Sequence, residues 1–311
     1  MSLDPYVQRF LQRLSVAAPR AIGSLTVAER RATLARLLSF AGEAPAAGRC
    51  EEREAPGPNG AVRLRIYTPI HAVDAALPGM IYFHGGGMVA GSLETHAPIA
   101  RSLADATGCR VVSVDYRLAP EARFPAALQD ACAAVHWVVR GSAQLGIDPA
   151  RLGVCGDSAG AALTAAVCQI RAAAGDGGIA FQVLLCPILD YRAAADGRRA
   201  YSGADLLDRE TLEHDLEHYL GPDCDPADPR ISPLAAPSVA GLPPASIHTA
   251  EHDPLREDGE LYAHRLGEAG VRTLYHCHPG MIHLFYGLGA VIPYAAQAYR
   301  RIGADTRALL D

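Results

Sequence analysis

The sequence predicts an α/β fold built on a central, mostly parallel sheet flanked by helices. From about residue 79 onward, short apolar runs alternate with helical stretches, which is the pattern of repeated strand–helix–strand units. Hydrophobic residues make up 50% of the 311 residues and charged residues 20%, as in an ordinary globular protein. A chain of this length buries a large core, so one α/β unit with insertions accounts for all of it.

The individual elements follow from periodicity and from their end signals. Two amphipathic helices are expected at 5–18 and 26–40, the second opening on a capping box made by Thr26 and Glu29. A β-hairpin follows, with its turn at Asn59-Gly60. Further strands are predicted at 80–83, 111–114, 152–155, 181–185, 245–249 and 273–276, and further helices at 95–107, 125–140, 159–174, 255–269 and 286–309.

One long segment interrupts the alternation. Between Pro187 and Leu242 the chain is polar and proline-rich, with a helix of its own that has Asp208 as N-cap and Gly221-Pro222 as its stop. An excursion from the carboxyl edge of a parallel sheet is a common place for an active-site lid. The sequence therefore predicts a helical cap from residues 1–45 and 188–241, over a core of residues 46–187 and 242–311.

Charge and composition argue against several classes of protein. The formal net charge of −6 and the absence of a Lys/Arg cluster disfavour a nucleic-acid partner. The start lacks a basic segment followed by an apolar one, and no run approaches ~18 apolar residues, so we expect a cytoplasmic protein without a membrane span. The eight cysteines are scattered without a C-x-x-C pair, which indicates buried thiols rather than a disulfide framework.

One short segment, His276-Cys277-His278, has the composition of a metal site. Alternation along a strand places both histidines on one face, but no further ligand lies near them in the sequence. We expect no metal and no cofactor.

A nucleophile is indicated by Gly156-Asp157-Ser158-Ala159-Gly160, which fits G-x-S-x-G between a predicted strand and an alanine-rich helix. A turn that raises a serine on a strained elbow needs neighbours without Cβ atoms, and the following helix directs its first N–H groups toward the site of attack. This context is that of the α/β-hydrolase nucleophile, and it makes Ser158 the candidate.

A candidate oxyanion loop, His84-Gly85-Gly86-Gly87, stands at the end of an earlier strand. Successive glycines let backbone N–H groups approach a substrate oxygen without a collision of side chains. Two donors among Gly85, Gly86 and Gly87, together with the N–H of Ala159, would stabilise the charge of a tetrahedral intermediate.

A serine needs a base and an orienting acid, which follow it in this fold in the order Ser, Asp, His. Asp253 comes directly after a predicted strand, although it could instead cap the next helix, and Glu251, Glu257 and Asp258 are alternatives. His283 lies between the last strand and the last helix, as the base must. The other histidines considered, in strands, in a turn or in mid-helix, are His252, His264, His276 and His278.

Several motifs together resemble the hormone-sensitive-lipase-like esterases, also called bacterial family IV esterases, from about residue 62 onward. Besides the loop, elbow, acid and histidine segments, they are Asp115-Tyr116-Arg117-Leu118-Ala119-Pro120-Glu121, Phe124-Pro125-Ala126-Ala127, Gly241-Leu242-Pro243-Pro244 and Asp253-Pro254-Leu255-Arg256. Two departures are Ala161-Ala162, where members commonly have Gly-Asn, and Leu284, where they commonly have glycine.

The resemblance implies a carboxylesterase for short- to medium-chain acyl esters, with Ser158, Asp253 and His283 as triad, a helical cap, no cofactor, and a homodimer. A non-catalytic ligand receptor on the same fold is an alternative, which His283 argues against. An amidase or a lactonase with the same triad is another, because the acyl-enzyme chemistry is shared.

Overall fold

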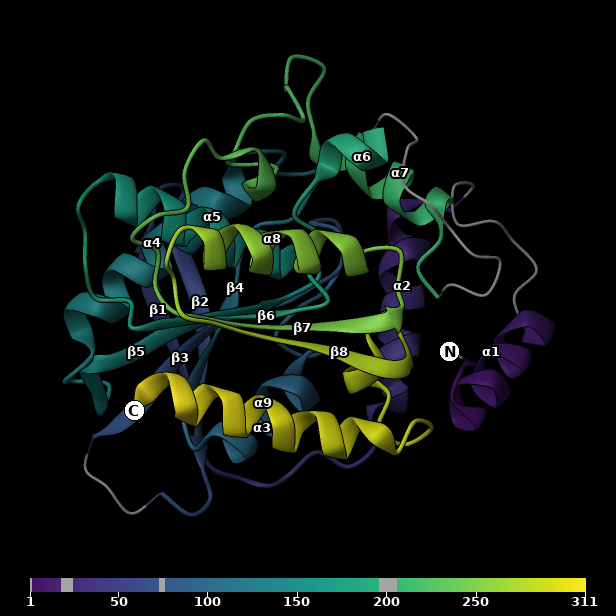
Figure 1. Ribbon diagram of the computed structural model, residues 1–311, viewed down its shortest axis with the longest axis horizontal. Helices are drawn as coiled ribbons and strands as arrows, with labels where there is room; N and C mark the ends of the chain where they lie inside the picture. The colour runs from purple at the N-terminus through teal and green to yellow at the C-terminus, as the bar shows by residue number, and fades with distance from the viewer. Residues whose placement is uncertain (1, 18–24, 73–75, 196–205) are drawn as a thin grey trace.

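The computed structural model describes residues 2–17, 25–72, 76–195 and 206–311, and in this part of the chain eight strands form one sheet (Figure 1). Their order across the sheet is β1-β2-β4-β3-β5-β6-β7-β8. The strands are β1 (Ala47–Gly57), β2 (Gly60–Pro69), β3 (Leu77–Phe83), β4 (Arg110–Asp115), β5 (Ile147–Asp157), β6 (Phe181–Leu185), β7 (Ala245–His252) and β8 (Thr273–Ile282). β2 runs antiparallel to β1 and β4, and the other neighbours are parallel, so the predicted mostly parallel sheet is confirmed.

Helices cover both faces of the sheet (Figure 1). On one face lie α4 (Ala126–Gly141), α5 (Ala159–Ala173) and α8 (Arg256–Glu268), and on the other α3 (Ala97–Thr107) and α9 (Tyr294–Leu310). The residues of α5 from Ala159 to Cys168 are all buried. A helix that is apolar all round must be covered on every side, so α5 is held firmly where it begins, directly after β5.

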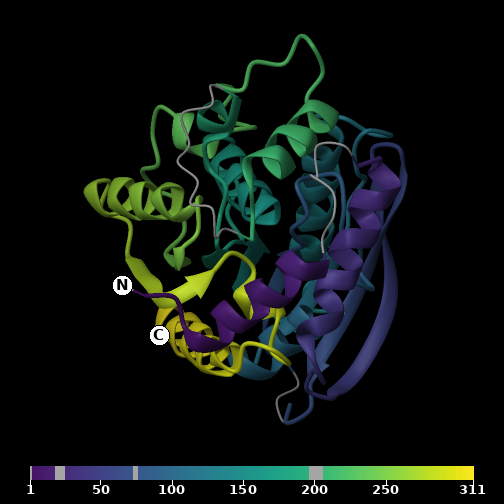
Figure 2. The same cartoon turned by 90° about the vertical axis from the view of Figure 1, so that its right-hand side faces the viewer.

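The remaining helices gather at the end of the sheet to which β7 and β8 point (Figure 1). They are α1 (Pro5–Ala17) and α2 (Val27–Leu38), which face the viewer in Figure 2, and α6 (Tyr191–Ala195) and α7 (Arg209–Tyr219). Short 3₁₀ turns span Ser39–Ala41, Pro233–Ala235 and Phe285–Gly287. Residues 18–24 and 196–205 of the two predicted cap segments lie outside the described residues.

Element boundaries differ most from the sequence prediction at α9 and β8. The last helix was expected from residue 286, but α9 begins at Tyr294, with Pro293 directly before it. Proline lacks the N–H that a helix interior needs, so it starts this helix instead of lying inside a longer one. β8 is longer than predicted and continues to Ile282, because the chain stays paired with β7.

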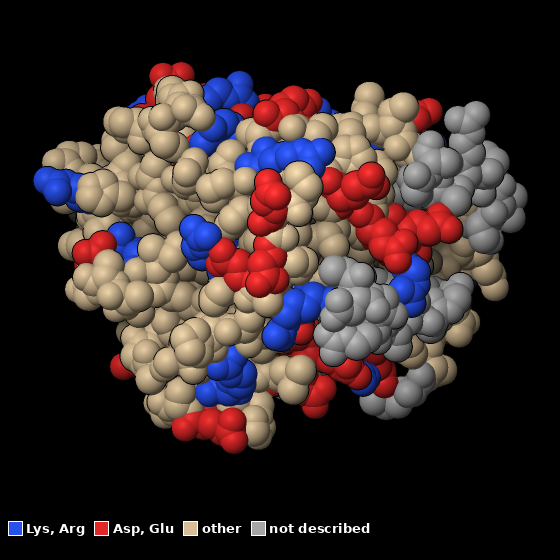
Figure 3. Space-filling model, turned by 90° about the horizontal axis from the view of Figure 1, so that it is seen from above, with Lys and Arg blue, Asp and Glu red and all other residues tan. Residues whose placement is uncertain are grey.

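The surface carries charges of both signs. On the face seen in Figure 3, outside the grey residues, basic side chains alternate with acidic and uncharged ones. Among the described helices, none has both the length and the apolar character needed to cross a bilayer.

Candidate active site

The segments that the sequence marked for chemistry leave the sheet at one edge. Each directly follows a strand: His84–Gly87 after β3, Ser158 after β5, Asp253 after β7 and His283 after β8. These four strands are parallel, so their carboxyl ends meet at the same edge of the sheet.

Ser158 has the backbone of a strained elbow. Its φ of 53° and ψ of −116° lie where an L-residue is rarely found, and such strain is typical of functional sites. The two motif glycines make the turn possible: a Cβ on Gly156 would overlap the carbonyl of Gly160, and a Cβ on Gly160 would overlap the carbonyl of Phe83. The turn therefore requires the glycines on both sides of the serine.

The three predicted side chains form one hydrogen-bonded chain. His283 Nε2 lies 3.1 Å from Ser158 Oγ, and His283 Nδ1 lies 2.8 Å from Asp253 Oδ2. A carboxylate only accepts hydrogen bonds, so Nδ1 carries the proton and Nε2 is left to accept from the serine hydroxyl. Asp253 and His283 are both 7% exposed, which shields this relay from water.

Asp253 also makes the contact that the helix-cap alternative predicted. Its Oδ1 accepts the N–H of Leu255 at 2.9 Å, while α8 itself begins at Arg256 with Leu255 as its N-cap residue. One carboxylate oxygen thus binds the turn and the other binds His283. The backbone contact holds the carboxylate in the orientation that meets the imidazole.

The oxyanion loop turns sharply against the elbow. Gly86 and Gly87 have φ of 122° and 66°, conformations that favour glycine. The N–H of Gly85 donates to Asp157 Oδ1 at 2.9 Å, whereas those of Gly86 and Gly87 have no hydrogen-bond partner among the described residues. Ala159 opens α5, where the first N–H groups have no partner within the helix.

Asp157 is a buried carboxyl that links the elbow to this loop. Besides Gly85, it accepts hydrogen bonds from Tyr82 Oη at 2.5 Å and Tyr286 Oη at 3.4 Å. Burial raises the pKa of Asp157 to about 6, although these donors favour the ionised form and act in the opposite direction. Asp157 therefore fixes the position of Gly85 relative to the serine.

The alternative acids are engaged elsewhere. Glu251 Oε2 accepts the N–H of Gly280 at 2.8 Å, and Asp258 Oδ2 accepts the N–H groups of Leu189 and Asp190. Glu257 is exposed. Of the four acidic candidates, only Asp253 meets a histidine that also reaches the serine.

The alternative histidines also lie apart from Ser158. His276 and His278 pack with His248, and His278 Nε2 lies 3.2 Å from His248 Nδ1. His252 lies near Glu251, and at the surface His264 Nδ1 lies 3.2 Å from Glu268 Oε2.

One group with metal-ligand spacing occurs among the described residues, and it differs from the predicted segment. It joins Cys186 to Asp253 and His283, with ligand atoms within 4.8 Å of one another. Two of its members are already hydrogen-bonded to each other, and burial raises the pKa of the Cys186 thiol well above its ordinary value. Asp253 and His283 are thus engaged in the relay to Ser158, and burial disfavours the thiolate form of Cys186 that a metal ion would need.

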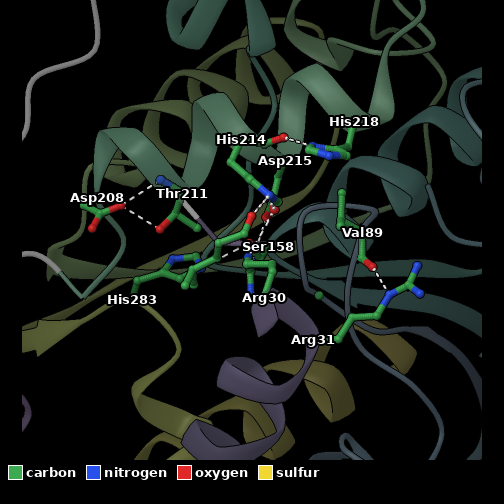
Figure 4. Close-up of polar contacts among 12 residues, drawn as sticks. Arg30, Arg31, Val89, Ser158, Asp208, Thr211, His214, Asp215, His218 and His283 are labelled. Carbon is green, nitrogen blue, oxygen red and sulfur yellow. Dashed lines mark hydrogen bonds and ion pairs between the residues drawn. The ribbon is translucent and has the colours of Figure 1, made fainter. Parts of the chain in front are cut away.

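A cavity of about 850 Å³ opens onto Ser158 and His283. Its walls come from the oxyanion loop and from α1, α2 and α7, and most of the side chains that line it are apolar. This volume lies in the range of small-molecule sites. Figure 4 shows Arg30 and Asp215 beside Ser158 and His283.

Comparison with known proteins identifies the family of this chain. Residues 80–287 match the family described as the alpha/beta hydrolase fold. The chain is 41% identical to "Carboxylesterase NlhH" of Mycobacterium tuberculosis over 80% of this chain and 79% of that one. It is 35% identical to "Arylesterase" of Saccharolobus solfataricus, over 92% and 93% of the two chains.

The solved structures give the same result. The structure of ester-hydrolase EH1AB1, from the metagenome of Lake Arreo and in complex with a derivative of bipyridine phosphonate, superposes with a TM-score of 0.94. The two chains are 37% identical, with 98% of each covered.

This chain belongs to the α/β-hydrolase fold family. Within it, the motifs and the named relatives place the chain among the hormone-sensitive-lipase-like esterases, and it is a carboxylic ester hydrolase.

The two departures from the pattern of this esterase family have clear places in the structure. Ala161 and Ala162 are buried within α5. Leu284 has a φ of 62° and ψ of 11°, the left-handed conformation that glycine adopts without strain. Its side chain is buried and lines the cavity. Leucine thus adds apolar surface to the cavity wall, at the cost of backbone strain that a glycine would avoid.

Three residues at this candidate site escaped sequence reasoning: Asp157, Arg30 and Asp215. Asp157 is the variable position of G-x-S-x-G, and its partners come from β3 and from the segment after β8. Arg30 and Asp215 are charged residues on amphipathic helices, where a solvent-facing position is the usual expectation. No signal in the sequence indicates that they meet.

Proposed function

We propose that this esterase cleaves carboxylic esters with Ser158 as nucleophile, His283 as general base and acid, and Asp253 as the group that orients His283. The observation that carries the proposal is the continuous relay from Ser158 Oγ through both ring nitrogens of His283 to Asp253. The placement of the relay on the cavity wall supports a role in binding and cleaving a small ester.

The reaction proceeds in two stages. Ser158 Oγ attacks the ester carbonyl while His283 Nε2 takes its proton, and the alcohol leaves after His283 returns that proton to it. Water then repeats the steps on the acyl-enzyme and releases the acid. Asp253 stays ionised and stabilises the imidazolium that forms in each stage.

The oxyanion would rest on the N–H groups of Gly86, Gly87 and Ala159. Gly85 donates its N–H to Asp157 instead, so among the three candidate glycines it contributes by holding the loop. Removing one donor should lower kcat about 10² to 10³-fold.

Residues 1–45 and 188–241 would act as a cap over this site. The described parts of both segments line the cavity through α1, α2 and α7, which supports the proposed division into cap and core. An apolar cavity of about 850 Å³ accommodates short- to medium-chain acyl groups. The homodimer and the cytoplasmic location stay predictions.

Activity assays separate this function from its alternatives. An aryl ester tests for a non-catalytic receptor, which would give no hydrolysis above background. An anilide with the same acyl group tests for an amidase, which would cleave both compounds at comparable rates, whereas this esterase should cleave only the ester efficiently.

Replacement of the nucleophile tests the assignment itself. Ser158→Ala and His283→Ala should each lower kcat on the order of 10⁶-fold, by analogy with another triad hydrolase. His264→Ala, which removes an exposed histidine on α8, is the matched control and should keep full turnover. Near wild-type turnover in Ser158→Ala would refute the proposal.

A further inference from the structure

Two helices of the proposed cap meet through a buried ion pair. Arg30 of α2 binds Asp215 of α7 with two hydrogen bonds, from Nε to Oδ1 at 3.1 Å and from Nη2 to Oδ2 at 2.7 Å (Figure 4). The side chains are 9% and 5% exposed. Moving both charges out of water costs free energy, so the pair is not explained by the solubility that surface charges provide.

Asp215 packs directly on the oxyanion loop. A Cβ on Gly87 would overlap the Asp215 carboxylate, so the carboxylate lies against the α-carbon of this glycine. On the neighbouring Gly86, a Cβ would come within 3.0 Å of Leu34 Cδ2 of α2. Both glycines proposed as oxyanion donors are therefore in contact with residues of the cap on the side where a Cβ would lie.

A bare carboxylate here would oppose catalysis. The tetrahedral intermediate carries a negative charge that the N–H of Gly87 is proposed to bind. A second negative charge on the buried Asp215 carboxylate would repel it, because burial weakens the screening by water. The guanidinium of Arg30 neutralises Asp215 along both of its oxygens. The pair thus lets the cap hold the loop without placing a net negative charge beside it.

In the described part of the chain, His214 is a second titratable side chain in contact with Asp215. Its Nδ1 lies 3.2 Å from Asp215 Oδ1, and its Nε2 lies 3.2 Å from the carbonyl of Leu25. Both partners only accept hydrogen bonds, so both contacts are satisfied by the protonated imidazole. The hydrogen bond to Asp215 correspondingly raises the pKa of His214.

Arg31 fixes α2 to the core beside this pair. Its Nε donates to the carbonyl of Val89 at 2.9 Å (Figure 4). Its guanidinium also binds Glu121 at 2.6 and 2.8 Å. Val89 lies two residues after Gly87. Consecutive arginines therefore tie α2 to the core on one side and to α7 on the other.

We propose that Arg30 and Asp215 are a positioning pair for the esterase reaction: Asp215 seats the cap on Gly87, and Arg30 cancels the charge that Asp215 would otherwise bring to the oxyanion. The inference rests on the proposed function, since it takes Gly87 as an oxyanion donor. Arg30 should therefore affect kcat and not the binding of one particular substrate.

The test compares Arg30→Met, Asp215→Asn and the double variant on a short-chain aryl ester at pH 9. All are made in a His214→Gln background, because an imidazolium at His214 would also neutralise Asp215. Arg30→Met should lower kcat about 10- to 100-fold with KM changed by less than about threefold, because an unpaired carboxylate is left near the oxyanion. Asp215→Asn breaks the same pair but leaves a positive charge, so it should lower kcat at least fivefold less than Arg30→Met does. The double variant should recover to the level of Asp215→Asn.

A merely structural pair gives a different pattern. If both single variants lose kcat equally, or if the double variant is as slow as Arg30→Met, the proposed charge cancellation is wrong. Thermal unfolding of each variant shows that the assays are made on folded protein, and Arg301→Met, which breaks an ion pair on α9, is the control for loss of an arginine. Failure of the proposed function is distinguishable, because Ser158→Ala would then retain turnover whatever the two single variants do.

Discussion

Asp157 occupies a position where one buried carboxyl serves two loops. It follows Gly156 in the elbow motif and binds the N–H of Gly85 in the oxyanion loop, with Tyr82 and Tyr286 as further donors. Burial raises its pKa to about 6 from an ordinary value of 3.8, so the folded state binds this proton more tightly than the unfolded state does.

The free energy of unfolding should depend on pH through the ionisation of Asp157. A raised folded-state pKa gives stabilisation that is complete below about pH 3.8 and is lost as the pH rises through about 6, on the order of 3 kcal/mol in all. Asp157→Asn cannot ionise and should lack this loss. Urea unfolding between pH 4 and pH 8 should show that the free energy of unfolding of Asp157→Asn increases relative to that of the wild type as the pH rises.

An exposed carboxyl provides the comparison. Asp176→Asn removes one carboxylate from the surface and should leave a difference from the wild type that changes little with pH. A pH-independent difference for Asp157→Asn as well would contradict the assignment of a buried, titrating Asp157.

At this scale, sequence reasoning succeeds where a residue's place in the chain decides its place in space. Ser158, Asp253 and His283 each follow a parallel strand directly, so the order of strands brings them to one edge. Asp157, Arg30 and Asp215 depend on partners 72, 185 and 185 residues away in the chain. Contacts of that kind are set by packing and leave no local pattern.

Among the elements, α2 shows which local signals hold. The predicted capping box is present: Thr26 Oγ1 accepts the N–H of Glu29 at 3.3 Å, and Glu29 Oε2 accepts the N–H of Thr26 at 2.8 Å. The start of α9 was predicted too early, at residue 286, because the helical pattern of apolar residues extends across Pro293. Helix N-caps and tight turns depend on neighbouring residues and can therefore be predicted. The residue at which a helix begins after a loop depends on how that loop packs against the rest of the fold.

Loss of the N-cap at Thr26 should destabilise α2, the helix that carries Arg30 and Arg31. Thr26→Ala removes the side-chain acceptor and should lower the free energy of unfolding by about 1 kcal/mol. Thr26→Ser keeps a hydroxyl at the N-cap and should stay within a few tenths of a kcal/mol of the wild type. Urea unfolding of the two variants measures the difference, and equal losses would show that the hydroxyl does not cap α2.

For the whole molecule, the decisive feature is a cavity that no single segment contains. Its walls come from α1, α2, α7 and the carboxyl edge of the sheet, which are far apart in the sequence. The cap over residues 1–45 and 188–241 stays a prediction, and the depth and lining of the cavity follow from how the helices pack. Acyl-chain preference is accordingly a property of the assembled fold.

Narrowing the cavity should change that preference. Leu212 of α7 lines the cavity and is 8% exposed. Leu212→Trp adds bulk there and should lower kcat/KM for octanoyl esters about tenfold more than for acetyl esters, since only the longer chain needs that space. Leu261→Trp, at a position that is 55% exposed on α8, is the control. Equal losses for both esters would place the acyl chain elsewhere.

The most direct test of the central claim is covalent labelling by an aryl phosphonate ester, followed by mass spectrometry of the intact chain and of its peptides. The relay from Ser158 to His283 and Asp253 predicts one phosphonyl group per chain, attached to Ser158, with loss of esterase activity in parallel. Ser158→Ala should remain unlabelled under the same conditions. A label on any other residue, or equal labelling of Ser158→Ala, would contradict the account.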